Sequence, residues 1–329
     1  MTLNLIMLAG GLLAILTGAK LFTNGVEWLG KRLNLSEGAV GSILAAVGTA
    51  LPETMVPLIA ILFAPTRNAH EVGIGAILGA PFMLSTLAFG VVGVSKVVYC
   101  RGEECIDVKR SILLRDLKFF LVFYSLAVMA AFIPLHALKV LVALLLVAGY
   151  GYYVKKTLGD GDTLAEMDLP PLFLWKRDSQ APVPAILAQV FLGLGLIAGG
   201  ADYFVSALDA LATGAMVPAL VLSLLITPVA TELPEKFNSV IWVKGGKDTL
   251  AVGNITGAMV FQSTVIPAIG ILFTPWLLTF WAALSAGLAL LSSFLIYLFV
   301  MRQKRLKTSV MIYPVAIYGL FLLMVITML

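Results

Sequence analysis

The chain has 329 residues, of which 60% are hydrophobic and 12% are charged. An ordinary soluble domain has about a quarter of its residues charged, so this composition excludes a soluble enzyme. The net charge of +4 does not indicate a nucleic-acid partner, because the basic residues lie in short segments between apolar runs, where they set membrane topology.

Five apolar runs, bounded by charges or by Gly and Pro clusters, occupy the first half of the chain. They span residues 3–29, 37–64, 71–96, 117–135 and 137–154. Each is close to the length of about 20 residues that a membrane-spanning helix needs. The first run lacks a basic leader and a small-residue cleavage site, so we expect it to be the first span and not a signal peptide.

A polar segment and five further apolar runs follow. The polar segment, 156–182, carries acidic and basic residues and two adjacent prolines. We interpret it as a cytoplasmic linker between a first domain, 1–155, and a second domain, 183–329. The later runs span residues 184–213, 216–243, 248–274, 276–300 and 309–328. The sequence therefore predicts an all-α membrane protein with ten transmembrane helices.

The distribution of positive charge supports ten spans. All but four of the 22 Lys and Arg residues fall in alternate connections, and the exceptions are Lys20, Arg67, Lys139 and Lys236. Because positively charged loops stay in the cytoplasm, we expect both termini to lie outside. We expect an integral protein of a bacterial or archaeal inner membrane, or of a plasma membrane, in contact with membrane lipid.

The two halves contain an internal repeat. A shift of 182 residues aligns Leu-Pro-Glu at 51–53 with Leu-Pro-Glu at 233–235, and it aligns two pairs of glycines, Gly11 with Gly193 and Gly18 with Gly200. Each copy holds five spans, an odd number, so the copies must lie in opposite orientations. Inverted repeats of this kind are typical of transporters, whose binding site lies near the midplane at broken helices.

The repeated motif carries oxygen ligands. Thr49 lies four residues before Glu53, and Thr231 lies four residues before Glu235, so each pair shares one helix face. A proline before each glutamate removes a backbone donor and frees a carbonyl oxygen. Carboxylate, hydroxyl and carbonyl oxygens are the ligands that Ca²⁺ prefers. The two glutamates would supply a charge of −2, which one divalent ion neutralises. The alternative is that they are protonated or paired residues that stabilise helix packing.

Glycines four residues apart mark the third and eighth runs. Gly75 and Gly79 in the first half correspond to Gly253 and Gly257 in the second. This spacing by itself indicates close helix packing. Because the pairs follow the Pro-Glu motif in both halves, close approach to the same site is the second interpretation.

These motifs resemble those of the cation/calcium exchanger superfamily, and most closely its sodium/calcium exchanger branch. The resemblance covers nearly all of both halves and is most specific at 48–53, Gly-Thr-Ala-Leu-Pro-Glu, and at 227–262, which includes Thr-Glu-Leu-Pro-Glu. It implies an inverted repeat, alternating access and a central site where Ca²⁺ competes with Na⁺ or H⁺. The partners are then small inorganic cations, with no cofactor besides the transported ions. A monomer is the expected state.

The resemblance also implies roles for particular residues. Glu53 and Glu235 would be the central carboxylates, and Thr49 and Thr231 would give hydroxyl or backbone oxygens. The long first and sixth helices would slide as the gate. On these helices Lys20 and Asp202 occupy equivalent repeat positions, which suggests a structural or gating pair, in contact or separately solvated.

Several positions depart from the family pattern. Side-chain oxygens that would help to bind coupling Na⁺ are replaced in both repeats, for example by Ala80, Leu84 and Ala258. This makes H⁺, or fewer Na⁺, the more credible coupling ion.

A secondary or coupling-ion site is expected beside the central one. Glu232 and Lys236 are additions four residues apart and can pair on a helix. The pair either stabilises the fold or places the Lys236 ammonium where relatives hold a coupling cation. The remaining members of this secondary site are Gln262, Ala46 and Pro228.

Other functions remain open at this stage. The same scaffold could move Mg²⁺, Mn²⁺ or a monovalent ion. Two intramembrane carboxylates could also serve an acid-base enzyme, although no other catalytic group accompanies them. A selective channel usually needs a ring of ligands from several subunits, so a single chain with an inverted repeat favours a cation antiporter.

Overall fold

The computed structural model describes residues 2–32, 51–64, 66, 68–100, 105–159, 170–175, 181–303 and 306–328. Within these ranges, the side chains at positions 30, 51, 158, 159, 233–235 and 238 are not described. Nearly all of the described chain is helical, as required where the backbone must satisfy its polar groups without water.

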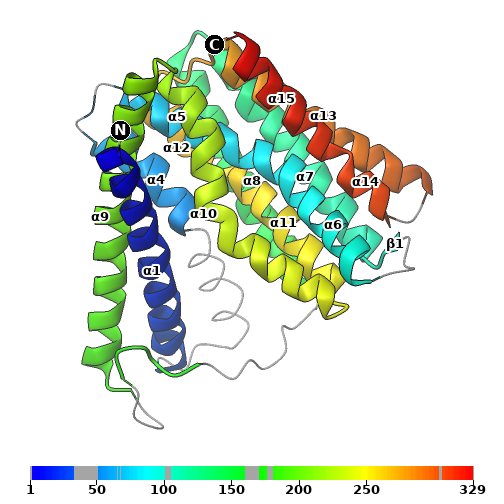
Figure 1. Ribbon diagram of the computed structural model, residues 1–329. Helices are drawn as coiled ribbons and strands as arrows, with labels where there is room; N and C mark the ends of the chain where they lie inside the picture. The colour runs from blue at the N-terminus through cyan, green and yellow to red at the C-terminus, as the bar shows by residue number, and fades with distance from the viewer. Residues whose placement is uncertain are drawn as a thin grey trace.

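The first half of the chain forms a series of helices (Figure 1). They are α1 (Thr2–Arg32), α4 (Leu51–Leu62), α5 (Ala69–Met83), the π-helix η2 (Leu84–Ala88), α6 (Phe89–Tyr99), α7 (Arg110–Met129), the 3₁₀ helix η3 (Ala130–Phe132) and α8 (His136–Gly159). The segments α5, η2 and α6 follow one another directly, so one apolar run forms a single helical stretch with a π-helical insertion.

The second half forms a second series of helices. They are α9 (Val183–Ala215), α10 (Ala219–Lys244), α11 (Asp248–Gln262), α12 (Val265–Phe273), α13 (Phe280–Gln303), α14 (Thr308–Ile312) and α15 (Pro314–Met328). Two short strands, β1 (Cys105–Ile106) and β2 (Leu306–Lys307), pair in antiparallel fashion and join the connections that follow α6 and α13. The start of α1 and the end of α15 lie at the same end of the molecule (Figure 1).

The all-α membrane fold is confirmed. Seven helical stretches within the described residues are long and apolar enough to cross a membrane, and two shorter apolar helices cover Pro52–Leu62 and Ala219–Glu232. Every apolar run predicted from the sequence contains a helix. The run at 248–274 is interrupted after Gln262, and the final run is interrupted before Pro314, where the missing N–H of proline prevents a regular helical bond.

Two predicted boundaries are wrong. The fourth helix begins at Arg110 and not at 117. Arg110 donates from Nε to the Val300 carbonyl at 3.2 Å and from Nη2 to the Met301 carbonyl at 3.1 Å, so the basic first turn is anchored on the end of α13. The fifth helix extends to Gly159, into the segment that the sequence assigned to the linker.

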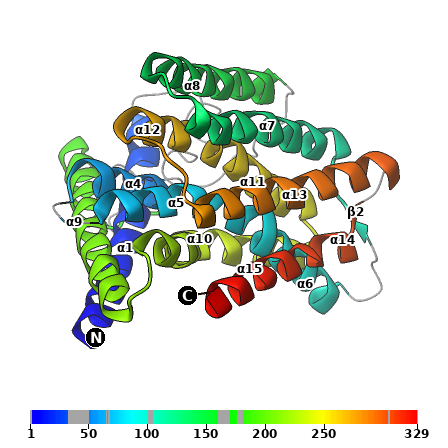
Figure 2. The same cartoon turned by 90° about the horizontal axis from the view of Figure 1, so that it is seen from above.

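The helices α1 and α9 form a pair along one flank of the molecule (Figures 1 and 2). A Cβ at Gly11 would lie 2.8 Å from the Gly200 carbonyl oxygen, and a Cβ at Gly18 would lie 2.7 Å from the Gly193 carbonyl oxygen. Residues later in α1 contact residues earlier in α9, so the two helices are antiparallel. Their backbones come this close because glycine has no side chain, which is how small residues bring helices together in lipid.

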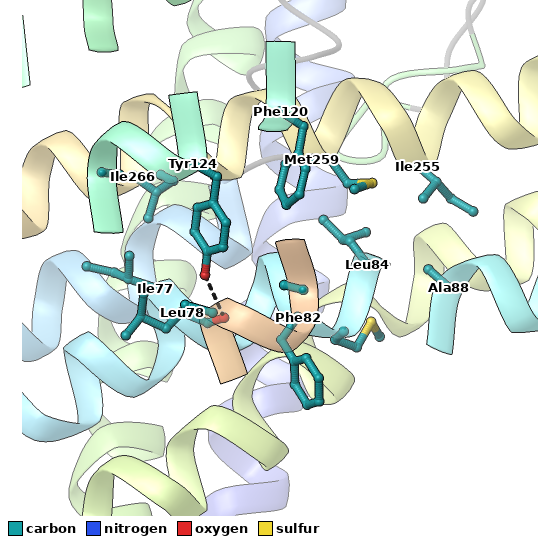
Figure 3. Packing of buried hydrophobic residues seen from close by; sticks show 14 of the residues in the cluster. Ile77, Leu78, Phe82, Leu84, Ala88, Phe120, Tyr124, Ile255, Met259 and Ile266 are labelled. Atoms are coloured by element: carbon teal, nitrogen blue, oxygen red, sulfur yellow. Dashed lines mark hydrogen bonds between the residues drawn. The ribbon is translucent and has the colours of Figure 1, made fainter. Parts of the chain in front are cut away.

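The remaining helices pack around a second, larger core. Figure 2 shows α8 and α7 on one face of the molecule and α6, α14 and α15 on the opposite face, with α5, α10, α11 and α13 between them. Leu84, Phe120 and Met259 meet in this core, and the Tyr124 hydroxyl donates to the Leu78 carbonyl at 3.5 Å (Figure 3). The core therefore joins elements of both halves.

Alanine substitutions at two adjacent glycines of α9 test how closely α1 and α9 pack. A Cβ at Gly200 would lie 2.7 Å from the Gly11 carbonyl oxygen, whereas a Cβ at Gly199 meets no atom within 4 Å. Gly200→Ala should therefore lower the thermal midpoint in detergent, since overpacking costs about 1–3 kcal/mol. Gly199→Ala should leave it unchanged or raise it, because Ala favours the helix by about 1 kcal/mol. Equal midpoints would contradict this close contact.

Candidate functional site

A stripe of buried hydroxyls runs along α10. Ser223, Thr227 and Thr231 are spaced four residues apart and are at most 2% exposed. Ser223 donates to the Val72 carbonyl at 2.6 Å, and its oxygen lies 3.0 Å from the Thr227 hydroxyl, which must be the donor because Ser223 has only one proton. Thr231 donates to the Thr227 carbonyl at 3.0 Å. Position 235 continues the same spacing.

Two glycines bring α5 against this part of α10. A Cβ at Gly75 would lie 2.9 Å from the Ser223 side chain, and a Cβ at Gly79 would lie 2.8 Å from the Pro228 ring. The packing interpretation of this glycine pair is therefore confirmed. The contact also lies beside the hydroxyl stripe of α10. The second interpretation, close approach of both glycine pairs to the same site, stays a prediction.

Prolines within the helices leave carbonyl oxygens without their usual donors. Pro228 lies inside α10, and Pro57 lies inside α4. A proline cannot donate to the carbonyl four residues earlier, so Pro228 and Pro57 give no helical hydrogen bond to the carbonyls of Leu224 and Glu53. Pro234 has the same effect on the Ala230 carbonyl. Such oxygens are tolerated at membrane depth where they line a polar site.

Glu53 lies near the contact between α4 and α10. It belongs to the first described turn of α4 and is 8% exposed. Two and three residues further on, Met55 and Val56 lie in the same apolar cluster as Ala230 of α10, and α4 packs against α10. Glu53 is thus a buried carboxylate at the start of a helix that packs against the helix of Thr231.

Glu232 and Lys236 form the ion pair expected from their spacing. The Lys236 Nζ lies 3.2 Å from Glu232 Oε2, and the two side chains are 8% and 3% exposed. Because α10 continues as a helix through position 234, the intervening proline does not prevent the contact. The pair is buried and carries no net charge.

Gln262 presents an oxygen that no described residue satisfies. It is the last residue of α11, and 3% of it is exposed. Its Oε1 atom is buried and accepts no hydrogen bond within the described part of the chain. An amide oxygen is a suitable ligand for a hard cation.

Several predicted site residues lie outside the residues that the structure describes. Thr49 and Ala46 are not among the described residues, and Glu235 is described only through the backbone of α10. Their part in the site stays a prediction. Within the described residues, no group of three His, Cys, Asp or Glu side chains could hold a metal.

Lys20 and Asp202 are not brought together. Lys20 is exposed, and its Nζ lies 5.5 Å from the centre of the Phe173 ring. Asp202 is exposed on α9, and none of the ion pairs formed by described residues joins it to Lys20. The antiparallel register explains the separation, because Gly18 faces Gly193, which lies nine residues before Asp202. The contact suggested by repeat equivalence is therefore absent.

Sequence reasoning missed a buried polar cluster behind the site. Thr256 of α11 donates to Asp116 Oδ2 at 2.7 Å, and Arg115 Nε donates to Asp116 Oδ1 at 3.1 Å. The isolated acidic residue among basic ones was the only sequence signal, because Asp116 and Thr256 are 140 residues apart.

The fold and these side chains define a class of protein. Buried carboxylate, hydroxyl and amide oxygens lie on helices of an all-α membrane fold. Intramembrane ionisable groups of this kind mark ion pathways. The class is that of secondary ion transporters.

Comparison with known proteins identifies the family. The profile of the family described as sodium/calcium exchanger protein matches residues 3–155 and 185–327. The chain belongs to this family, and it is therefore an integral membrane antiporter for cations and not an enzyme.

Individual relatives have low sequence identity to this chain but match most of its length. The putative antiporter CaxA of Alkalimonas amylolytica is 26% identical over 80% of this chain and 79% of its own. The inner membrane protein YrbG of Escherichia coli is 25% identical over 84% and 81%.

Two solved structures share the fold. One is an H⁺/Ca²⁺ exchanger, CAX, with a TM-score of 0.72 and 16% identity, covering 98% of this chain and 82% of that one. The other is the sodium-calcium exchanger NCX_Mj, with a TM-score of 0.59 and 21% identity over 98% of each chain.

Single and double variants test how much the Glu232–Lys236 ion pair contributes to the free energy of unfolding. Glu232→Gln leaves a buried ammonium without its carboxylate and should lower the free energy of unfolding by about 3–5 kcal/mol. The double variant Glu232→Gln with Lys236→Met removes both charges and should recover most of the loss. Thermal unfolding in detergent measures both, and Lys244→Met, at an exposed position of α10, is the control. An unaffected single variant would show that the pair does not stabilise the fold.

Proposed function

We propose that this protein exchanges Ca²⁺ for Na⁺ or H⁺ by alternating access at a central site built around Glu53 and Glu235. The observation that carries the proposal is the buried Glu53 beside α10, whose hydroxyl stripe leads to position 235. Thr49 and Thr231 contribute oxygens to the same site. Two carboxylates and neutral oxygens suit a divalent cation, and an empty site with two charges is too costly to cross the membrane.

Reciprocal contacts support an inverted repeat. Gly11 packs against Gly200 and Phe204, and Gly193 packs against Gly18 and Phe22. After the shift of 182 residues, Gly18 corresponds to Gly200 and Phe22 corresponds to Phe204. The two glycines therefore contact equivalent residues of the opposite copy. Two copies related by a two-fold axis make contacts of this kind. The family match, which leaves out 156–184, also supports two five-helix domains, 1–155 and 183–329, joined by a cytoplasmic linker.

The proposed topology has ten spans with both termini outside. The start of α1 and the end of α15 lie at one end of the molecule (Figure 1), as an even number of spans requires. The gate in this proposal is the α1–α9 pair, with Lys20 and Asp202 as separately solvated gating charges.

The coupling ion in this proposal is H⁺ or Na⁺. The two solved relatives are named as an H⁺/Ca²⁺ exchanger and a sodium-calcium exchanger. Leu84 lies in the apolar core of this chain (Figure 3) at a position where the family usually has a side-chain oxygen. This favours H⁺, or fewer Na⁺. The proposed members of the secondary site are Gln262, Glu232, Lys236, Pro228 and Ala46. A different cation, Mg²⁺, Mn²⁺ or a monovalent ion, is the alternative substrate.

Transport into proteoliposomes tests the proposal. Ca²⁺ uptake should follow an outward Na⁺ or H⁺ gradient, and Glu53→Gln or Glu235→Gln should lower it at least about tenfold, because losing 1.4 kcal/mol of ion binding has that effect. Glu71→Gln, at an exposed carboxylate of α5, is the matched control and should transport normally. No uptake under either gradient would overturn Ca²⁺ exchange and direct the assay to the other cations.

A further inference from the structure

The Asp116 cluster connects three helices next to the proposed site. Asp116 of α7 is 2% exposed. It accepts hydrogen bonds from Thr256 of α11 and from Arg115, whose guanidinium lies 5.5 Å from the centre of the Tyr153 ring of α8. A Cβ at Gly257 would lie 3.8 Å from the Tyr153 hydroxyl oxygen. The cluster therefore faces the glycine motif of α11.

Asp116 is a buried carboxylate. Burying a charge is costly for the fold unless the charge is paired and hydrogen-bonded. The other basic groups of α7 do not need Asp116, because Arg110 binds carbonyls at the end of α13 and Lys118 is exposed. What distinguishes Asp116 is its bond to a hydroxyl on another helix.

Polar contacts anchor α11 at two levels, in its first turn and at Thr256, and both levels lie before Gln262. Asp248, in the first turn, is bound by Lys96 at 2.6 Å, and Thr256 is bound by Asp116. Gln262 ends the helix six residues later, about 9 Å along the axis at 1.5 Å per residue. Its buried amide oxygen accepts no bond from a described residue. The position of this oxygen therefore depends on the rotation and depth that the two anchors give to α11.

We propose that Asp116 is a positioning residue for cation binding: through the Thr256 hydroxyl it holds α11 so that the Gln262 amide oxygen faces the transport site. The inference rests on the proposed function, because it assigns that oxygen to the transported cation. A hydrogen bond to a carboxylate is about twice as strong as one between neutral groups, which suits an anchor that must keep a helix in register. Arg115 compensates the buried charge and leaves Oδ2 for Thr256.

The experiment compares variants at both ends of this bond. Thr256→Val replaces the hydroxyl with a methyl group of similar shape, and Thr256→Ser restores the donor. Asp116→Ala removes the acceptor, and the double variant combines it with Thr256→Val. Thr249→Val is the control, because Thr249 lies on α11 but bonds the Asp107 carbonyl. The readouts are the KM and maximal rate of Ca²⁺ uptake, together with hydrogen exchange over 253–262.

Asp116→Ala and Thr256→Val should each raise the KM about tenfold, as expected for the loss of one charge-assisted hydrogen bond. Hydrogen exchange over 253–262 should rise in both variants. Thr256→Ser and Thr249→Val should keep the wild-type KM. The double variant should be no worse than the more affected single variant, because both changes remove one interaction.

Two results would overturn the inference: an unchanged KM in folded Thr256→Val protein, or effects that multiply in the double variant. If Asp116→Ala does not fold, the comparison of Thr256→Val with Thr256→Ser decides the question alone. If the wild-type protein does not take up Ca²⁺ at all, the proposed function fails instead. Hydrogen exchange then decides whether Asp116 positions α11, and unchanged exchange in both variants rejects that role.

Discussion

In the interior of this membrane protein, buried charged and polar groups need partners within the protein, because lipid cannot supply them. Some of the described charges meet this constraint within one helix, as Glu232 and Lys236 do, and others do so by joining segments that are distant in sequence. Lys96 at the end of α6 binds Asp248 at the start of α11 at 2.6 Å, and Lys139 of α8 donates to the Pro275 carbonyl at 2.6 Å. These contacts connect the first half of the chain to the second, so the charged residues define which helices are neighbours as much as the apolar ones do.

The apolar contacts follow from the same environment. Lipid tails are as apolar as leucine, so burial alone gives little reason for two helices to associate in a membrane. Close backbone packing provides one, and this chain uses it in two separate places. Gly18 and Gly193 join α1 to α9, while Gly75 and Gly79 join α5 to α10. The first interface holds the flanking pair together, and the second holds the inner helices. In our proposal the flanking pair moves as a unit against the inner helices.

The sequence was sufficient to predict features that depend on near neighbours in the chain. Apolar runs became helices, and the spacing of Glu232 and Lys236 gave their ion pair. It was not sufficient where the partner lies far away. Nothing near Arg110 indicates that it caps α13, so the start of α7 was placed too late. Repeat equivalence also misled for Lys20 and Asp202, because an antiparallel pair separates residues that occupy equivalent positions.

The arrangement of charge on α10 bears on why exchange is obligatory in the proposed mechanism. Positions 231 and 235 form one line along the helix, and Glu232 and Lys236 form the adjacent line, turned by about 100°. The adjacent line is neutral because its two members pair at 3.2 Å. The net charge of the central site then depends on Glu53 and Glu235 alone. One divalent ion neutralises two carboxylates, and so do two monovalent cations or protons, so either load can cross the membrane while the unloaded site cannot. The ion pair thus keeps an extra acidic residue beside the site without changing the charge that a transported ion must balance.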